Sequence, residues 1–327
     1  MLKKITLLIM LLLCLCLWGC AKPGVQNTNS ADYGSAYTAV DDAGRTLKFK
    51  EKPHRIVSLT YGTDEIITDL VDLKRIVAYS RWAGDNGITF ITKEQAFKVG
   101  CKVHDNLESI LKLQPDLVVA SIATSNDVIS SLENVGIPVY IARSPHNYEE
   151  MRSKVMNLAQ AVGEKEQGQA LVQRMDERLA KLEQKLSSLP SSERKVAVAF
   201  NFTSAMGRRG DLLDSMLTMA HVINGAAAVT PPKSEHGSVI ISKEMVVRIN
   251  PDIFLLPTWN YNDKQDVQGY AHQVMNDPAY KNVKAVQNGQ LRFVSDKYRY
   301  VSSHHIVEAI EEIAKAVYPE LFKEGKK

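Results

Sequence analysis

The sequence predicts an α/β protein of two Rossmann-like lobes that are joined by a single long interdomain helix. Short apolar runs alternate with segments of helical spacing in both halves of the chain, which is typical of parallel α/β sheets. Between the halves, residues 147–188 are strongly helical and heavily charged. The apolar heptads there are too few for a coiled coil. We therefore expect an N-terminal lobe at 37–146, an interdomain helix region at 147–190 and a C-terminal lobe at 191–327.

The first half begins with a hairpin and continues with strands and helices in turn. Residues 37–49 alternate around a turn at Asp41–Gly44, a pattern that predicts a β-hairpin. The apolar runs Arg55–Leu59 and Arg75–Ser80 are predicted strands. Helical spacing separates these two runs, and Thr63 is the expected N-cap of the helix.

The second half repeats this order after the long helical stretch. Lys195–Phe200 and Asp252–Pro257 are apolar enough to be buried strands, and Val301–Pro319 has the spacing of a terminal helix. Within the helical stretch, we expect Gly163 to separate a shorter helix from a longer one.

One short pattern occurs in both halves. The segments are "NLESILKLQPDLVV" from Asn106 and "SKEMVVRINPDIFL" from Ser242, with Glu108 and Glu244 at matching positions. Favourable placement of Glu near the positive end of a helix explains each copy separately. It explains less well why the whole pattern recurs at the same spacing, so we expect one copy of this element in each lobe.

The N-terminus has the features of an export signal. Two lysines precede an apolar run that is too short for a comfortable membrane span. Cys20 follows this run as in a bacterial lipoprotein signal, although Trp18 is bulkier than the usual residue at its position. We expect residues 1–19 to be removed, Cys20 to be lipidated and residues 20–36 to form a flexible tether. The alternative is an ordinary secretory signal in which Cys20 is incidental.

Composition excludes several classes of function. The formal charge is +3 and no long basic block occurs, so no nucleic-acid partner is expected. After removal of the signal, Cys20 and Cys101 are the cysteines that remain; we expect no internal disulfide and no zinc cluster. An exported hydrolase using Ser302, Ser303 and His304 stays an alternative, although the chain has no G-x-S-x-G, H-E-x-x-H or P-loop motif. A structural or adhesive lipoprotein is the third alternative.

Five segments, taken in this order behind a lipoprotein signal, resemble one known family. They are "RIVSLTYGTDEIITDLVDLKRIVAYS", "NLESILKLQPDLVVAS", "LENVGIPVYIA", "ISKEMVVRINPDIFLL" and "NDPAYKNVKAVQNGQLRFVS". The family contains the substrate-binding proteins of ABC importers for cobalamin, haem and ferric siderophores, which are class III periplasmic binding proteins. The resemblance covers about Tyr37 to Phe322. It implies a ligand cleft between the lobes of a monomeric binding protein that is not an enzyme and has no resident cofactor.

The resemblance also gives the repeated element a function. In the cobalamin-binding member, one exposed Glu on each lobe pairs with arginines of a permease dimer, and Glu108 and Glu244 are the matching positions here. The implied partners are therefore an ABC permease dimer with its ATPase subunits. The implied location is a lipid anchor on the extracytoplasmic face of the cell membrane, which is the periplasm where an outer membrane is present.

The resemblance places the ligand between loops at the strand ends. Aromatic rings there offer apolar walls, and guanidinium groups pair with anionic chelates. A ferric siderophore is expected first, then cobalamin and then haem; ordinary packing of the rings and a solvated turn at "GRRGD" are the competing explanations. No dedicated metal site is expected, and the candidates for an axial haem ligand are His236, Met206, Tyr61 and His104. The predicted ligand-binding residues are Tyr61, Arg81, Trp82, Arg208, Arg209, Trp259, Tyr261, Tyr298 and Arg299.

Overall fold

The computed structural model describes residues 36–104, 106–229, 241–261 and 264–323. The predicted signal peptide, the predicted lipidation site Cys20 and the candidate haem ligand His236 lie outside the described residues. Among the described helices, none combines the length and the apolar character needed to span a bilayer.

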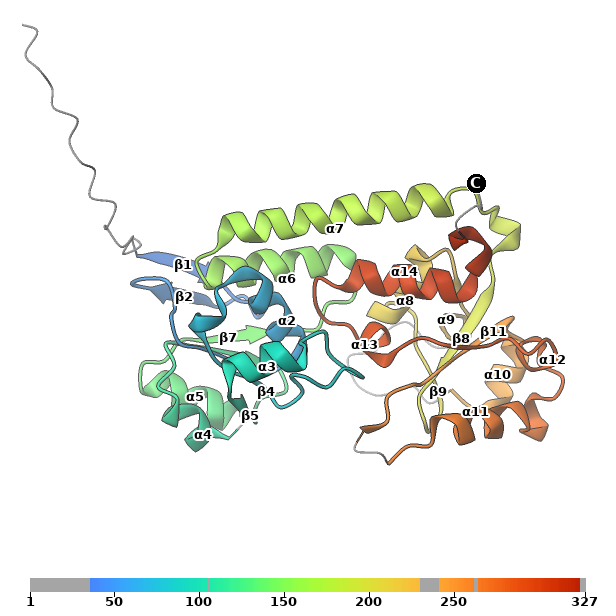
Figure 1. The fold of residues 1–327 in the computed structure, drawn as a ribbon, viewed down its shortest axis with the longest axis horizontal. Helices are drawn as coiled ribbons and strands as arrows, with labels where there is room; N and C mark the ends of the chain where they lie inside the picture. Colours follow the sequence, from blue (N-terminus) through green and yellow to red (C-terminus); the bar gives the residue numbers. More distant parts are fainter. Residues whose placement is uncertain (1–35, 105, 230–240, 262–263, 324–327) are drawn as a thin grey trace, which may run out of the picture. The chain divides into compact units, whose positions relative to one another are not determined.

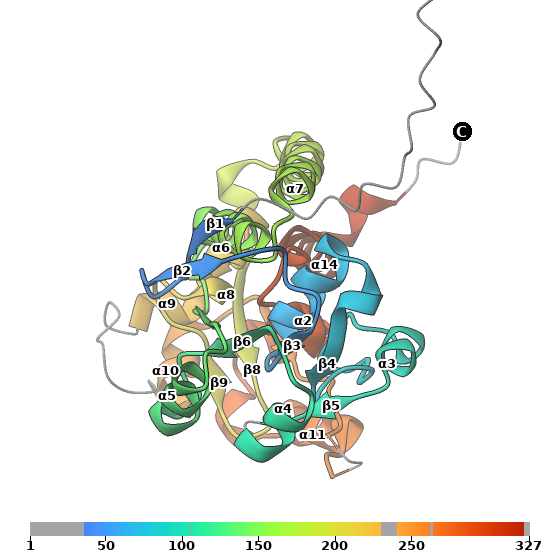
Figure 2. The same ribbon diagram turned by 90° about the vertical axis from the view of Figure 1, so that its left-hand side faces the viewer.

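The N-terminal lobe is built on a parallel sheet in the order β5-β4-β3-β6-β7 (Figures 1 and 2). Strands β3, β6 and β7 consist almost entirely of buried residues, most of them apolar, as expected for a parallel sheet with helices on both faces. The predicted hairpin is confirmed beside this sheet. The strands are β1 (Tyr37–Val40), β2 (Thr46–Phe49), β3 (Ile56–Ser58), β4 (Ile76–Ser80), β5 (Lys102–Val103), β6 (Leu117–Ser121) and β7 (Val139–Ala142).

The first helix of this lobe begins earlier than the sequence indicates. Its N-cap is Thr60, whose side chain accepts a hydrogen bond from the Thr63 backbone N–H. The prediction of Thr63 as the cap is wrong, because Thr63 is fully buried and its hydroxyl lies 2.8 Å from that of Ser58. The helices of this lobe are α2 (Tyr61–Leu70), α3 (Lys93–Val99), α4 (Leu107–Lys112) and α5 (Asn126–Asn134), with the short η1 (Leu73–Arg75).

Two antiparallel-running helices follow, α6 (Tyr148–Ala161) and the long α7 (Lys165–Leu186). Gly163 separates them with φ +75°, so the predicted break is confirmed. A side chain at this position would strain the backbone and would also approach Lys52 Cγ to 2.6 Å. In Figure 1, α7 runs above both sheets and is the predicted interdomain helix.

The C-terminal lobe repeats the parallel arrangement in the order β10-β8-β11-β12, and β9 pairs with β8 in the antiparallel sense. The strands are β8 (Val196–Phe200), β9 (Ala205–Met206), β10 (Ile223–Asn224), β11 (Ile253–Leu256) and β12 (Leu291–Phe293). The helices are α8 (Leu212–Met219), α9 (Gly225–Val229), α10 (Lys243–Ile249), α11 (Val267–Met275), α12 (Lys284–Gln287), α13 (Asp296–Arg299) and α14 (Ile306–Val317), with the short η2 (Ser191–Glu193), η4 (Pro278–Tyr280) and η5 (Pro319–Phe322).

The repeated sequence pattern occupies equivalent places in the two lobes. Helix α4 leads into β6, which pairs with the first strand of its sheet, β3. Helix α10 leads into β11, which pairs with the first strand of its own sheet, β8. Asn106 and Ser242 are the N-caps of these helices, as predicted.

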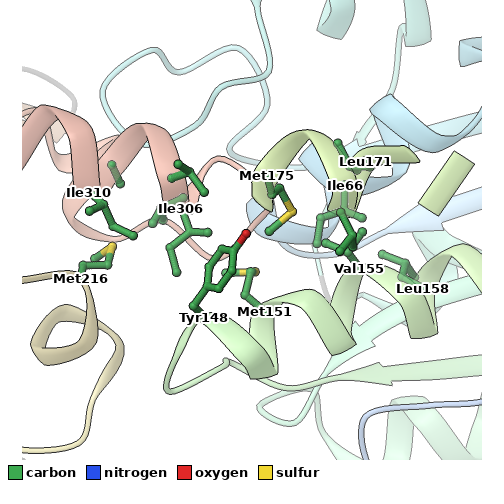
Figure 3. Packing of buried hydrophobic residues seen from close by; sticks show 14 of the residues in the cluster. Ile66, Tyr148, Met151, Val155, Leu158, Leu171, Met175, Met216, Ile306 and Ile310 are labelled. Carbon is green, nitrogen blue, oxygen red and sulfur yellow. The ribbon is translucent and has the colours of Figure 1, made fainter. Parts of the chain in front are cut away.

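A single hydrophobic cluster connects the lobes through their helices. It contains Ile66 of α2, Val155 of α6, Leu171 of α7, Met216 of α8 and Ile310 of α14 (Figure 3). Residues from Ser35 onward accordingly form one compact unit. The shared helical layer fixes the position of the strand ends of each sheet. The predicted domain limits at 146 and 190 stay predictions.

Candidate functional site

Several predicted ligand-binding residues lie directly after strands. Tyr61 begins α2 shortly after β3, and Trp82 follows the end of β4. Trp259 and Tyr261 follow β11 in the other lobe. Since side chains beyond the carboxyl ends of parallel strands line the ligand crevice of open α/β sheets, these positions are suited to binding.

Three of these side chains contact one another and form what we call the aromatic cluster, defined as Trp82, Trp259 and Tyr261. The ring centroids lie 5.4 Å apart for Trp82–Trp259, 5.5 Å for Trp82–Tyr261 and 5.2 Å for Trp259–Tyr261. The Arg81 guanidinium carbon lies 4.1 Å from the centre of the Trp82 ring. All three rings keep some exposure, and Tyr261 is 40% exposed. The cluster therefore offers apolar ring surface with one cation beside it.

Asp85 and Gly87 complete this contact between the lobes, although the sequence analysis did not single them out. The indole Nε1 of Trp259 donates a hydrogen bond to Asp85 Oδ2 at 3.0 Å. A Cβ at position 87 would lie 2.2 Å from Trp259 Cδ1, so a larger residue there would displace the indole. The sequence shows a turn at "GDNG", but it carries no sign that the turn faces a residue more than 170 positions away.

A buried carboxyl group holds the Arg81 loop from beneath. Asp64 of α2 is fully buried and accepts hydrogen bonds from the Ser80 backbone N–H and from Ser80 Oγ, the latter at 2.6 Å. Burial raises the pKa of Asp64 to about 7. Ser80 ends β4 and precedes Arg81, so this contact fixes where the Arg81–Trp82 loop leaves the sheet.

The predicted tyrosines are divided between two environments. The Tyr61 hydroxyl donates a hydrogen bond to the Tyr300 carbonyl at 2.8 Å, and burial raises the pKa of Tyr61 to about 12. Tyr298 packs edge-on against Phe90, with ring centroids 5.2 Å apart. Tyr61 thus joins the two lobes through its hydroxyl, whereas Tyr298 packs beside α14 rather than within the aromatic cluster.

Arg299 is an interior residue. It is 2% exposed, and its guanidinium lies 3.2 Å from Asp296 Oδ1 and donates to the Phe200 carbonyl. Asp296 in turn accepts hydrogen bonds from the backbone N–H groups of Thr258 and Trp259 at 2.8 and 2.7 Å. The structure thus gives Arg299 a supporting position behind the Trp259 loop, without direct access to a ligand.

Arg208 and Arg209 lie in another loop of the C-terminal lobe, immediately before α8. The Arg208 backbone N–H donates to Asp211 Oδ2, the side-chain cap of that helix, at 3.0 Å. The Arg209 guanidinium donates to the Ala227 carbonyl at 3.1 Å. Their loop is therefore tied to α8 and α9, separately from the aromatic cluster.

A second contact between the lobes is polar and mostly buried. We call it the polar cluster, defined as Glu65, Asp69, Lys154, Ser302, Ser303 and His304. Lys154 Nζ donates to the Ser302 carbonyl at 2.9 Å, and Ser303 Oγ donates to Glu65 Oε2 at 2.5 Å. His304 Nε2 lies 3.0 Å from an Asp69 carboxylate oxygen. Burial lowers the pKa of Lys154 to about 8, and burial also lowers the pKa of His304.

The polar cluster does not form a hydrolytic triad. The Ser303 hydroxyl is directed to Glu65, and the Ser302 hydroxyl lies 3.1 Å from Lys154 Nζ. His304 faces Asp69 instead of either serine. Catalysis by a Ser–His pair needs the hydroxyl and the imidazole in hydrogen-bond contact, and neither serine makes that contact with His304.

The described residues bring together no set of three or more His, Cys, Asp and Glu side chains that would hold a metal ion. Among the predicted axial haem ligands, the Met206 sulfur accepts hydrogen bonds from Arg299 and Tyr300. His104 is exposed next to β5.

Glu108 and Glu244 both lie in the exposed first turn of their helices. Glu108 Oε1 is 2.7 Å from Lys112 Nζ on the same helix. The hydrogen bond from Ser242 lowers the pKa of Glu244. Both helices lie below α7 in Figures 1 and 2, so each lobe carries one copy of the repeated helix on the side away from the interdomain helix.

Two α/β lobes that face each other through aromatic and charged side chains at their strand ends define a two-lobed binding protein. The sequence model of the family described as "Periplasmic binding protein" matches residues 56–298, which is more than half of the chain. The chain therefore belongs to this family.

Individual relatives are distant but nearly full-length. The chain is 25% identical to the uncharacterized ABC transporter substrate-binding lipoprotein YvrC of Bacillus subtilis, over 96% of this chain and 97% of YvrC. It is 22% identical to the probable siderophore-binding lipoprotein YfiY of the same organism, over 90% and 91% of the two chains. The crystal structure of molybdate-bound MolA from Haemophilus influenzae superposes with a TM-score of 0.69 at 20% identity, covering 89% of this chain and 94% of MolA. The structural likeness confirms the fold.

Proposed function

We propose that this protein is the extracytoplasmic substrate-binding protein of an ABC importer, and that it captures a ferric siderophore or a related metal chelate. Its membership of the periplasmic binding protein family and its similarity to lipoproteins of ABC transporters support the transport function. The lipoprotein names of these relatives also support an anchor at Cys20, on the extracytoplasmic face of the membrane.

The choice of ligand rests on the aromatic cluster and on Arg81, which lies beside it. Trp82 and Trp259 supply broad ring surfaces for an amphipathic ligand, and Arg81 supplies a permanent cation for its anionic groups. A ferric siderophore combines these two properties and brings its own metal ligands. Cobalamin and haem also present large rings, and they remain the alternatives within this class.

Transfer of the ligand requires docking on the permease. We propose that Glu108 and Glu244 bind arginines of the two permease subunits, since arginine–carboxylate pairs are specific in geometry and orient the partners. A lipid anchor raises the effective concentration of the two proteins, so a modest affinity suffices.

The ligand is identified by a thermal-shift panel and visible absorbance spectra on the chain without residues 1–20. The panel contains cobalamin, haem, and ferric catecholate, hydroxamate and carboxylate siderophores. A ligand at one hundred times its Kd adds about 2.7 kcal/mol to the free energy of unfolding, which the assay resolves. A shift with a ferric siderophore supports the proposal. A shift with cobalamin or haem alone, or with no member of the panel, contradicts the choice of ligand.

The docking residues are tested by uptake in cells that carry Glu108→Ala together with Glu244→Ala. We expect uptake to be lost while ligand affinity is unchanged. Glu94→Ala is the matched control, because Glu94 is also an exposed first-turn residue that pairs with a lysine on its own helix, at 2.9 Å. Uptake at the native rate in the double variant would show that these residues do not dock.

A further inference from the structure

We propose that Asp85 and Gly87 of the N-terminal lobe are positioning residues that hold the Trp259 indole of the C-terminal lobe, and that this contact controls access to the aromatic cluster in the ligand-free protein. This proposal depends on the proposed function only for the identity of the ligand that enters the aromatic cluster. The contact itself stands on the geometry of the two loops.

Gly87 provides the space for this contact. Its φ is not in the left-handed region, unlike that of Gly84 in the same loop, so the backbone conformation does not require glycine at this position. The requirement comes from the other lobe, because an added Cβ would lie 2.2 Å from Trp259 Cδ1 and 3.0 Å from Nε1. The N-terminal loop is thus shaped to receive this one indole.

Asp85 holds the indole once it is in place. Its Oδ1 accepts a hydrogen bond from the Gly87 backbone N–H at 3.0 Å, which orients the carboxylate within its own turn. Its Oδ2 accepts the indole N–H at 3.0 Å. A hydrogen bond to an ionised acceptor is stronger than a neutral one. The carboxylate therefore stabilises both the conformation of its own loop and the contact between the lobes.

The C-terminal lobe fixes the other end of the same residue. The Trp259 backbone N–H donates to Asp296, and Asp296 is held by its ion pair with buried Arg299. The indole is thus fixed at its backbone by its own lobe and at its ring by the opposite lobe. In this position the Trp259 ring meets Trp82 in an edge-to-face contact with an interplanar angle of 71°, so each indole covers part of the surface that the other would offer to a ligand.

Access to the cluster consequently depends on release of the indole from Asp85. A ligand that inserts between the two tryptophans must first separate the loops, so the closed contact lowers the fraction of molecules that are ready to bind. Loss of one such hydrogen bond is expected to change this fraction by roughly tenfold.

The protein provides its own probe for this contact. The sequence has three tryptophans, and removal of residues 1–20 deletes Trp18, so Trp82 and Trp259 are the remaining ones. The fluorescence emission and its quenching by acrylamide then report on the aromatic cluster alone. No ligand is needed, so failure of the siderophore proposal leaves this test intact.

The experiment compares the native chain without residues 1–20 with Asp85→Ala and Gly87→Ala. We expect both variants to emit at longer wavelength and to be quenched by acrylamide at least about twice as strongly, because the indole is released to water. Asn86→Ala is the matched control, since Asn86 is an exposed residue of the same turn; it is expected to behave as the native protein.

Native emission and quenching in both folded variants would overturn the proposal. Circular dichroism checks that the variants are folded. If Gly87→Ala does not fold, Asp85→Ala and Trp259→Phe test the proposal. Both are expected to fold, because Asp85 is only partly buried and Phe keeps an aromatic ring while it removes the indole N–H. In Trp259→Phe the remaining Trp82 should become more accessible to acrylamide, and unchanged accessibility contradicts the contact.

Discussion

Two of the contacts between the lobes are built from different chemistry. The aromatic cluster is partly exposed, and one hydrogen bond from Trp259 to Asp85 fixes it. The polar cluster is mostly buried, and a lysine, two serines and a histidine there have partners across the contact. Buried polar groups are costly to separate, whereas a half-exposed ring contact is not. The comparison teaches that one contact is suited to opening and the other to serving as a fixed pivot.

The largest expected effect comes from Glu65→Ala in the polar cluster. Glu65 accepts hydrogen bonds from Thr89 Oγ1, the Phe90 N–H and Ser303 Oγ, and the substitution leaves these donors buried without a partner. We expect the free energy of unfolding to fall by about 3 kcal/mol or more, measured by urea denaturation. Glu51→Ala, at an exposed position, is the control. A loss below about 1 kcal/mol would show that the polar cluster is not the stronger contact.

The next-largest effect is on the pH dependence of the free energy of unfolding, which Lys154→Met is expected to change. The folded-state pKa of Lys154 is about 8 and the ordinary value is 10.5, so the unfolded chain binds more protons between these values. The free energy of unfolding should therefore rise with pH from about 8 to 10.5 in the native protein, by about 2–3 kcal/mol relative to the variant.

The groups that act on Lys154 are the carboxylates of Asp42 and Glu65 and its acceptor Ser302. Tyrosines ionise equally in both proteins, so the difference between the two curves isolates the lysine. If the free energy of unfolding of the two proteins changed in parallel with pH, Lys154 would not be buried as a cation at neutral pH.

A smaller effect is expected when the aromatic contact is weakened. Trp259→Phe removes the hydrogen bond to Asp85 and keeps a ring, so the free energy of unfolding should fall by only about 1 kcal/mol. The measurement is the same urea denaturation that is used for Glu65→Ala. A loss as large as that of Glu65→Ala would remove the distinction between the two contacts.

The smallest effect concerns the relative motion of the lobes. Because the polar cluster and the shared hydrophobic cluster of α2, α6, α7, α8 and α14 remain in place, ligand binding should change the radius of gyration by less than about 1 Å. Small-angle scattering with and without the ligand found in the thermal-shift panel measures this change. A decrease of several ångströms would mean that the pivot is not fixed.

The sequence predicts the regular elements well and the long-range contacts poorly. The parallel sheets, the break at Gly163 and the repeated helix of each lobe follow from periodicity and capping, which are local properties. The prediction of Thr63 as the cap fails because the burial of Thr63 depends on Ser58, a contact outside the helix.

The candidate site shows the same limit. The aromatic residues at strand ends could be selected from sequence because strand ends are predictable. The interior position of Arg299 could not, because it depends on Asp296 and on the Phe200 carbonyl of a distant strand. The role of Gly87 is not predictable from sequence for a similar reason, since its neighbour Trp259 comes from the other lobe.

The contact between Glu65 and Ser303 spans 238 positions of the chain. The hydrophobic cluster likewise joins Ile66 near one end of the fold to Ile310 near the other. Contacts of such long sequence separation form late and slow the acquisition of the native state. A chain that crosses a membrane from its N-terminus would therefore leave α2 and α6 without their final partners until α14 has emerged. In the export that we propose, these two helices would expose apolar surface to proteases and to aggregation until then.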